Sequence, residues 1–585
     1  MVLAGAGSGK TRVLTHKVAY LISDKKVAPH NILMVTFTNK AADEMRNRVV
    51  NLLGSSEEEL PLMGTFHSFC AKLLRIEGDV LGLSKNFVIY DTSDSERAIK
   101  MAMEKLSISP KNYKVGAVLS YISNAKNELL SPEEYKNYAR GYFAEAVAKI
   151  YVEYQKILKE NNALDFDDLL FKSVELLKQD PAAQERISKR YKYVLVDEYQ
   201  DVNRTQYVLT KLLSAYWGNL TVVGDASQAI YGFRGADFRN ILNFQKDFPK
   251  VQAFNLEENY RSSQNILDAA YAVIAKNTSH PILKLWTKNS EGQKLILAET
   301  SNEVAEANFI VKVIKESQYP FSDFAILYRT NAQSRALEEA FLHDRVPYRL
   351  VGGLRFYERK EIKDILAHLR VIANPKDSVA INRIEKLGKT RLKKFLLAVP
   401  DIDPLSKPID LIETVLDKTD YLLLIDDGTD QGSARVENVK ELKSVASGFE
   451  AIDAFLENVA LMETGYTPSG RLKSDEGPKV TLMTIHAAKG LEFPIVFLVG
   501  MEEGLFPHSR SLMEPDQLEE ERRLAYVAIT RAKEKLYITY TRERLYFGTR
   551  SSSVISRFVI DIPEHLLLPL GGLNIPERPE YLDNY

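Results

Sequence analysis

The stretch Ala4-Gly5-Ala6-Gly7-Ser8-Gly9-Lys10-Thr11 decides the fold predicted for this chain. It matches the loop that cradles nucleotide phosphates, with Ala4 in place of the usual first glycine. In such a loop the backbone N–H groups surround the phosphates, Lys10 reaches the β- and γ-phosphates, and Thr11 places its hydroxyl on Mg²⁺. Residues 1–3 predict a strand before the loop, and residues 12–14 predict a helix after it. The alternative is a flexible Gly/Ser turn that binds nothing.

Length and composition indicate a globular protein of several domains. The chain has 585 residues, which suggests about four domains of ~150 residues each. Hydrophobic residues make up 45% and charged residues 27%, as is usual for folded proteins. The net charge of −2 gives no general cationic surface, so any contacts with a nucleic acid must be local.

The single cysteine, Cys70, excludes a disulfide within the chain and fits a reducing, cytoplasmic compartment. Its neighbours Phe69 and Leu73 favour a buried structural thiol over a nucleophile. No run approaches 18 uncharged apolar residues and no secretion signal begins the sequence, so no membrane association is expected. No Cys/His cluster has zinc spacing, and the only metal expected is one that accompanies a nucleotide.

Short β-branched runs predict parallel strands that are buried on both faces. One set comprises residues 32–35, 193–196 and 220–223, and a second set comprises residues 324–327, 495–499 and 535–538. Two separate sets imply two α/β cores. Residues 79–159 and 373–478 lack this pattern and are predicted to be mostly helical insertions, one in each core. Within residues 143–158, for example, apolar side chains recur three or four apart, as on one face of a helix.

Paired acids follow the strand predicted at residues 193–196. In an ATPase with a phosphate loop, the first acid at such a strand end holds Mg²⁺ and the second polarises the attacking water. Asp197 suits the metal and Glu198 suits the water. A solvated acidic strand end is the alternative, and the loop around Lys10 favours the catalytic interpretation.

A second strand end carries Gln228, which could sense a γ-phosphate, and then the aromatic residues Tyr231 and Phe233. Aromatic rings beside the guanidinium of Arg234 can form a stacking platform for unpaired bases. Taken alone, these aromatic residues would more often belong to a core.

The ordered set of motifs resembles superfamily 1A DNA helicases of the UvrD/PcrA/Rep type over nearly the whole chain. After the phosphate loop, the matching segments are residues 36–42, 64–69, 164–169, 196–201, 224–236, 256–262, 327–331, 352–361, 484–493 and 521–532. The resemblance implies two RecA-like parallel-sheet cores, each with a helical insertion. The first core is expected to comprise residues 1–78 and 160–252, with residues 79–159 as its insertion. The second core is expected to comprise residues 253–372 and 479–568, with residues 373–478 as its insertion. Residues 569–585 are expected to form a flexible tail.

The resemblance also implies roles at the nucleotide. Lys10 and Thr11 bind phosphate and Mg²⁺, Asp197 binds Mg²⁺, Glu198 activates water and Gln228 senses the γ-phosphate. Arg261 and Arg531 are implied as arginine fingers from the second core, which suits a permanently charged, forked guanidinium. The resemblance implies that Arg12, Tyr260 and Glu492 contact the adenosine. Arg12 belongs to the first core, and Tyr260 and Glu492 are expected to belong to the second.

For DNA, the resemblance implies base stacking and backbone contacts from separate sets of residues. The implied stacking residues are Phe37, Phe66, Tyr231 and Phe233, and the residues that contact phosphates and sugars are Thr36, Arg234 and His486. Position 233 is commonly tryptophan in this family, and phenylalanine offers a smaller stacking face. A metal-ligand role for His486 lacks a partner at suitable spacing.

Together these features predict an ATP- and Mg²⁺-dependent 3′→5′ DNA helicase and translocase that acts on single strands and on single-strand/duplex junctions. Hydrolysis in a cleft between the cores would drive movement, in DNA repair, replication or recombination, as a monomer or a DNA-induced dimer with repair or replication proteins as partners. Alternatives are a translocase that displaces proteins, the motor of a helicase–nuclease complex, an RNA helicase, or an inactive DNA-binding fragment. The family's upstream glutamine, which selects adenine, is absent from the sequence, which predicts a truncated start or relaxed adenine selection.

Overall fold

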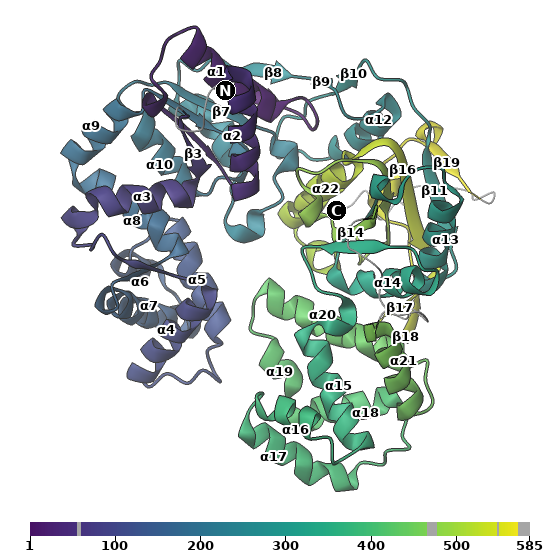
Figure 1. Cartoon of the computed structure of the whole chain (residues 1–585). Helices are drawn as coiled ribbons and strands as arrows, with labels where there is room; N and C mark the ends of the chain where they lie inside the picture. Colours follow the sequence, from purple (N-terminus) through teal and green to yellow (C-terminus); the bar gives the residue numbers. More distant parts are fainter. Residues whose placement is uncertain (55–59, 465–476, 547–548, 571–585) are drawn as a thin grey trace. The chain divides into compact units, whose positions relative to one another are not determined.

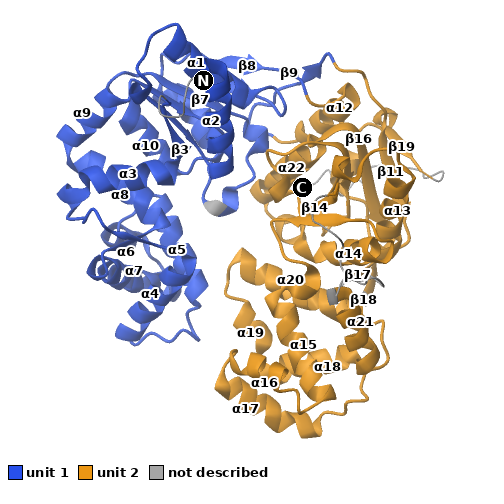
Figure 2. Cartoon of the chain, in the orientation of Figure 1, with its two compact units in different colours: residues 1–260, 278–288 blue, residues 261–277, 289–585 orange. Residues whose placement is uncertain are grey.

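The computed structural model describes residues 1–54, 60–464, 477–546 and 549–570. Its contacts divide the chain into two compact units, shown in different colours in Figure 2. The first unit contains residues 1–260 and 278–288, and the second contains residues 261–277 and 289–585. Each unit has one large parallel sheet, so the predicted pair of α/β cores is confirmed.

The first unit is built on a six-stranded parallel sheet in the order β3-β2-β6-β7-β1-β8. Of these strands, β3, β7 and β8 are labelled in Figure 1. The strands are β1 (Val2–Ala4), β2 (Ile32–Thr36), β3 (Leu62–Thr65), β6 (Tyr193–Val196), β7 (Leu220–Gly224) and β8 (Phe254–Leu256). The three strands predicted from β-branched runs are therefore present. Because β8 pairs with β1, with Phe254 opposite Val2, this sheet extends past residue 252, where the sequence placed the end of the first core.

Both faces of this sheet are buried, which explains the continuous apolar runs. Ile32 and Met34 of β2 belong to one core cluster, and the alternating Leu33 and Val35 belong to another. The first cluster includes side chains of α1 (Lys10–Ser23) and α2 (Asn39–Leu53). The second includes side chains of α3 (Phe66–Glu77), α8 (Phe166–Gln179), α9 (Pro181–Arg190), α10 (Arg204–Ser214) and α11 (Arg239–Asp247). Cys70 of α3 is fully buried, and burial raises the pKa of its thiol to about 12, as expected for a structural cysteine.

A helical segment is inserted between α3 and α8. Its helices are α4 (Thr92–Lys105), α5 (Val115–Asn127), α6 (Pro132–Tyr138) and α7 (Tyr142–Glu160). The periodic apolar face predicted for residues 143–158 lies in α7 and packs into a separate core cluster with α4 and α5. A short parallel pair, β4 (Val88–Tyr90) with β5 (Ala163–Asp165), was not predicted, because three-residue strands carry too little periodicity to be detected.

The second unit contains a seven-stranded parallel sheet in the order β13-β14-β12-β15-β16-β11-β19. The strands are β11 (Leu295–Thr300), β12 (Phe324–Tyr328), β13 (Tyr348–Val351), β14 (Val480–Thr484), β15 (Phe493–Leu498), β16 (Ala532–Thr541) and β19 (Leu567–Pro569). Helices α12 (Gln264–Ile274), α13 (Glu303–Glu316), α14 (Ser334–His343) and α22 (Pro515–Ile529) lie beside the sheet in Figure 1. The short α23 (Arg557–Ile560) precedes β19 in the sequence. β19 pairs with β11, and the predicted tail lies outside the described residues from 571 onward.

Helices also dominate the insertion of the second unit. They are α15 (Lys360–Ala373), α16 (Ser378–Glu385), α17 (Lys389–Ala398), α18 (Pro408–Thr419), α19 (Tyr421–Ile425), α20 (Asp430–Ala446) and α21 (Ile452–Thr464). Their apolar side chains form one core cluster of their own. Part of the predicted range, residues 465–476, lies outside the described residues. Among the residues that the structure describes, no helix has both the length and the apolar character needed to cross a bilayer.

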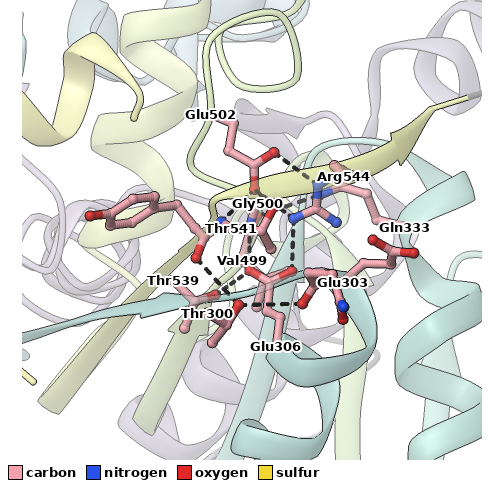
Figure 3. A network of polar contacts seen from close by, with 12 residues as sticks. Thr300, Glu303, Glu306, Gln333, Val499, Gly500, Glu502, Thr539, Thr541 and Arg544 are labelled. Carbon is pink, nitrogen blue, oxygen red and sulfur yellow. Dashed lines mark hydrogen bonds and ion pairs between the residues drawn. The ribbon is translucent and has the colours of Figure 1, made fainter. Parts of the chain in front are cut away.

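A buried ion network ties together the strand ends of the second unit (Figure 3). Arg544, at the start of the hairpin β17 (Glu543–Tyr546) and β18 (Thr549–Ser552), lies 2.9 Å from Glu306 and 2.6 Å from Glu502. Glu306 of α13 also accepts hydrogen bonds from Thr539 and from the Gly500 backbone, and Glu502 accepts from Thr541. Burial alone would lower the pKa of Arg544, but the two carboxylates raise it well above its ordinary value. The network thus joins α13, β16 and the loop after β15.

We expect Arg544→Met to lower the free energy of unfolding by about 3–5 kcal/mol, because it leaves two buried carboxylates without their cation. The neighbouring exposed pair Arg542–Glu299, 3.0 Å apart, supplies the matched control. Arg542→Met should change stability by no more than about 0.5 kcal/mol. Urea denaturation of both variants measures the difference, and equal losses would contradict this account of the network.

Candidate active site

The phosphate loop lies between β1 and α1 in the first unit and has the backbone that an anion site requires. Gly7 and Gly9 have φ angles of 66° and 90°, a region that favours glycine. Gly9 is the N-cap of α1, and no side chain caps this helix end. The N–H groups of the first turn, which begins at Lys10, therefore remain available to an anion at the positive end of the helix dipole.

Lys10 supplies the clearest evidence for a ligand. Its Nζ is buried and has no hydrogen-bond partner among the residues that the structure describes. A buried ammonium without a partner is costly, and phosphate oxygens would satisfy it. The residues present therefore fit the phosphates of a nucleotide.

Thr11 and Asp197 converge as the predicted Mg²⁺ ligands. The Thr11 hydroxyl lies 3.3 Å from Oδ2 of Asp197, which directly follows β6. Burial, the larger cause, and the negative charge of Glu198, the smaller cause, raise the pKa of Asp197 to about 7. The positive charge of Lys10 acts in the opposite direction. Hydroxyl and carboxylate oxygens suit Mg²⁺, which usually takes its remaining ligands from phosphates and water. The described part of the chain contains no cluster of three or more His, Cys, Asp or Glu side chains that could hold a metal.

Glu198 has an unusual backbone next to this pair. Its φ of 49° and ψ of 45° place a non-glycine residue in the left-handed region. Such a conformation costs about 1–3 kcal/mol and persists where the surroundings impose it, often at functional sites. Its carboxylate accepts a hydrogen bond from Gln200, a residue to which the sequence analysis assigned no role.

Gln228 is buried at the end of the neighbouring strand β7. Its Nε2 donates a 2.6 Å hydrogen bond to Asp225, which also accepts from the Ser227 backbone at 3.0 Å. Burial raises the pKa of Asp225, while the charge of Lys10 opposes this shift. Asp225 lies in the motif at residues 224–236, where no role was predicted for it, although its position directly after β7 could have indicated one.

Tyr260 belongs to the first unit, which corrects its expected place in the second core. Its backbone N–H donates to the Gly7 carbonyl at 3.0 Å, and the Asn259 side chain donates to the Ala6 carbonyl at 2.6 Å. β9 (Glu258–Asn259) and β10 (Trp286–Thr287) pair here, and a Cβ at Gly5 would lie 2.4 Å from the Leu285 side chain. These contacts explain why Tyr260 belongs to the first unit, since residues 258–260 and 285–287 pack against the phosphate loop. The side chains of Tyr260 and Arg12 are exposed.

The residues expected to act from the second unit lie together within it. Arg261 donates to Glu492 at 2.6 Å and to the Thr530 carbonyl at 3.1 Å. Burial opposes the charge of Glu492, but hydrogen bonds from Lys533 and Arg261 outweigh this effect and lower its pKa.

Arg531, which the resemblance implied as an arginine finger, is only 1% exposed in this structure. Its guanidinium donates to the carbonyls of Val527, at 2.8 Å, and Leu491, at 3.1 Å. The negative end of α22 accounts for this arrangement, since unpaired carbonyls at a helix C-terminus attract cations.

Two predicted DNA contacts are buried. Phe66 is 1% exposed, and its ring packs edge-on against Phe37, with centroids 5.9 Å apart. Phe66 packs into the core beside Phe37, so its ring has no exposed face in this structure, and its expected stacking role stays a prediction. Phe37 remains half-buried, and Thr36 is buried at the end of β2.

The loop after Gln228 presents aromatic rings to solvent. Phe233 is 51% exposed, and its ring lies 6.1 Å from that of Tyr231, tilted by 58°. The side chain of Arg234 lies outside the described residues. His486 is half-buried in the second unit, in a short helical turn after β14.

Comparison with known proteins agrees with this arrangement. The family model for the UvrD/REP helicase N-terminal domain matches residues 1–249 of the sequence. The family model for the UvrD-like helicase C-terminal domain matches residues 254–398 and 409–543. The chain is 43% identical over 622 residues to the ATP-dependent DNA helicase PcrA of Bacillus subtilis, covering 97% of this chain and 84% of the relative. The proteins of the same name from Staphylococcus epidermidis and Staphylococcus aureus are 43% and 42% identical over 618 residues, with the same coverage. The chain therefore belongs to the UvrD/REP helicase family.

Proposed function

We propose that this chain is an ATP-dependent DNA helicase that moves 3′→5′ along single-stranded DNA and separates duplexes ahead of it. The observation that carries the proposal is the buried Lys10 ammonium without a described partner, at the uncapped N-terminus of α1. Asp197 and Glu198, at the end of β6 in the same sheet, supply the acids that hydrolysis of a nucleotide requires.

In this proposal the phosphate loop and Lys10 bind the triphosphate, while Thr11 and Asp197 hold Mg²⁺. When bound, the ion would supply positive charge that offsets the negative charge of the triphosphate. Glu198 orients the attacking water and takes its proton, so the carboxylate must be ionised and correctly aimed. Gln228 contacts the γ-phosphate, which lets the loop that follows it respond to the state of the nucleotide.

Arg261 and Arg531 are proposed to stabilise charge on the transferring phosphoryl group. Each would first have to release the contacts that it makes in this structure with Glu492 or with backbone carbonyls. Tyr260 and Arg12 are proposed to flank the adenine, and their exposure leaves both side chains available to do so.

For DNA, the exposed ring of Phe233 beside Tyr231 supports the proposal of a base-stacking surface in the first unit. Phe37 would add a second, smaller face. Thr36, Arg234 and His486 are proposed to contact phosphates and sugars, which carry no sequence information and suit a motor that moves along any sequence.

Lys10→Ala should lower kcat for ATP hydrolysis on the order of 10²- to 10³-fold, because it removes the charge that faces the phosphates. Lys17→Ala is the matched control on the same helix, since Lys17 bonds to Thr221 at 2.7 Å and not to the loop. A steady-state ATPase assay compares them. Wild-type hydrolysis by Lys10→Ala would remove the basis for this site.

Mg²⁺ and ATP together should displace a proton from Asp197. With a pKa of about 7, this carboxyl is half protonated at neutral pH, and a bound cation favours its ionised form. Calorimetry in buffers of different ionisation enthalpy should therefore detect release of roughly half a proton per chain at pH 7 and little at pH 8.5. Asp197→Asn should lose this pH-dependent release, and an unchanged release would contradict the assignment.

Direction of movement can be tested with partial duplexes that carry one single-stranded tail. We expect ATP-dependent unwinding of the 3′-tailed duplex and little unwinding of the 5′-tailed duplex. A blunt duplex and an assay without ATP are the controls. Unwinding of the 5′-tailed substrate alone would overturn the proposed polarity.

A further inference from the structure

Gln200 is a fully buried side chain in the short turn that follows Glu198. Its amide joins two neighbouring strand ends of the first unit. Nε2 donates to the Glu198 carboxylate at 2.5 Å and to Asp201 at 3.3 Å. Oε1 accepts from the backbone N–H of Asp225, which follows β7, at 3.0 Å. A single amide therefore connects the end of β6 with the end of β7.

The chemistry of this position requires an amide. The carboxylate of Glu198 needs a donor, and the N–H of Asp225 needs an acceptor, so the two ends of the glutamine have one consistent orientation. A carboxylate at position 200 would face the acids Glu198 and Asp201, and an apolar side chain would leave the buried N–H of Asp225 without its partner.

Gly224 makes room for the connection. A Cβ at this position would lie 2.7 Å from Oε1 of Gln200 and 2.8 Å from the Ile241 side chain, which is too close for either. Because Gly224 does not have a positive φ, its backbone conformation does not require glycine. Glycine is required here because the Gln200 side chain approaches the backbone closely. The strand end is thus shaped to admit the Gln200 amide.

The connection continues to the residue proposed to sense the γ-phosphate. Asp225, whose N–H is held by Gln200, accepts from Gln228 at 2.6 Å. Glu198, Gln200, Asp225 and Gln228 therefore form one continuous chain of hydrogen bonds within the first unit.

We propose that Gln200 is a positioning residue for ATP hydrolysis, which holds the Glu198 carboxylate in one orientation and couples it to Asp225 and Gln228. This inference rests on the proposed function, in which Glu198 takes a proton from the attacking water. A side chain as long as glutamate has several rotamers, and misplacement of a reacting group by about 1 Å can cost on the order of 10²-fold in rate. Binding of ATP does not depend on this orientation, so the effect belongs to kcat.

Gln200→Leu, which removes both ends of the amide, should lower kcat for DNA-stimulated ATP hydrolysis on the order of 10²-fold and change KM for ATP by less than about threefold. Gln200→Glu keeps an acceptor for the Asp225 N–H but loses the donor to Glu198. Gln200→Glu should therefore lower kcat to a similar extent. Because this variant still supports the strand end through the Asp225 N–H, its loss of kcat would come from the orientation of Glu198. If Gln200→Leu does not fold, Gln200→Glu alone decides the question.

Gln206→Leu is the matched control. Gln206 is another buried glutamine of the same unit, where it accepts from the Asn203 backbone at 3.1 Å and caps α10. Its replacement should lower the melting temperature by about 2–4 °C and leave kcat within about twofold of the wild type. A purely structural role for Gln200 predicts the same pattern as Gln206→Leu.

Two different failures can be told apart. If the wild-type chain does not hydrolyse ATP in the presence of single-stranded DNA, the proposed function fails. If the wild type hydrolyses ATP and folded Gln200→Leu or Gln200→Glu retains kcat within about threefold, the inference about Gln200 fails and the function stands. A wild-type kcat with a raised KM in these variants would likewise overturn it, because that result would place Gln200 in ATP binding.

Discussion

The first unit depends on one electrostatic constraint, a buried ammonium at the end of a parallel sheet. Lys10 begins α1 after a strand that is buried on both faces, and its charge acts on Asp197 and Asp225 at the ends of two further strands. The Lys10 Nζ has no hydrogen-bond partner among the described residues. A triphosphate with Mg²⁺ would satisfy all three groups at once, which explains why a site with this much unsatisfied charge persists.

The surrounding backbone is arranged around the same constraint. Gly7 and Gly9 have positive φ angles, and Asn259 and Tyr260, which lie 253 residues later in the sequence, donate hydrogen bonds to the loop carbonyls of Ala6 and Gly7. Glu198 adopts a left-handed backbone beside Asp197, and Gln200 fixes its carboxylate. Strand ends, loop and side chains thus form one hydrogen-bonded assembly, so catalytic groups from distant parts of the sequence keep a common geometry.

Sequence patterns were sufficient for the elements with strong periodicity or chemistry. β2, β6, β7, β12, β15 and β16 appeared as apolar runs because both sheet faces are buried, and α7 appeared through its apolar stripe. Side-chain environment was harder to predict. A motif position does not reveal that Phe66 lies behind Phe37, that Arg531 caps its own helix, or that Gln200 joins two strand ends, since each depends on packing between segments far apart in sequence. Short pairs such as β4 with β5 leave no pattern at all.

We propose that nucleotide hydrolysis at Lys10, Asp197 and Glu198 drives movement on DNA. The most direct measurement is the rate of ATP hydrolysis by the purified wild-type chain as single-stranded DNA is titrated in the presence of Mg²⁺. The account predicts a rate that rises at least about tenfold and saturates, since a motor spends ATP only when it is bound to its track. Hydrolysis that is absent, or that is the same with and without DNA, would contradict it.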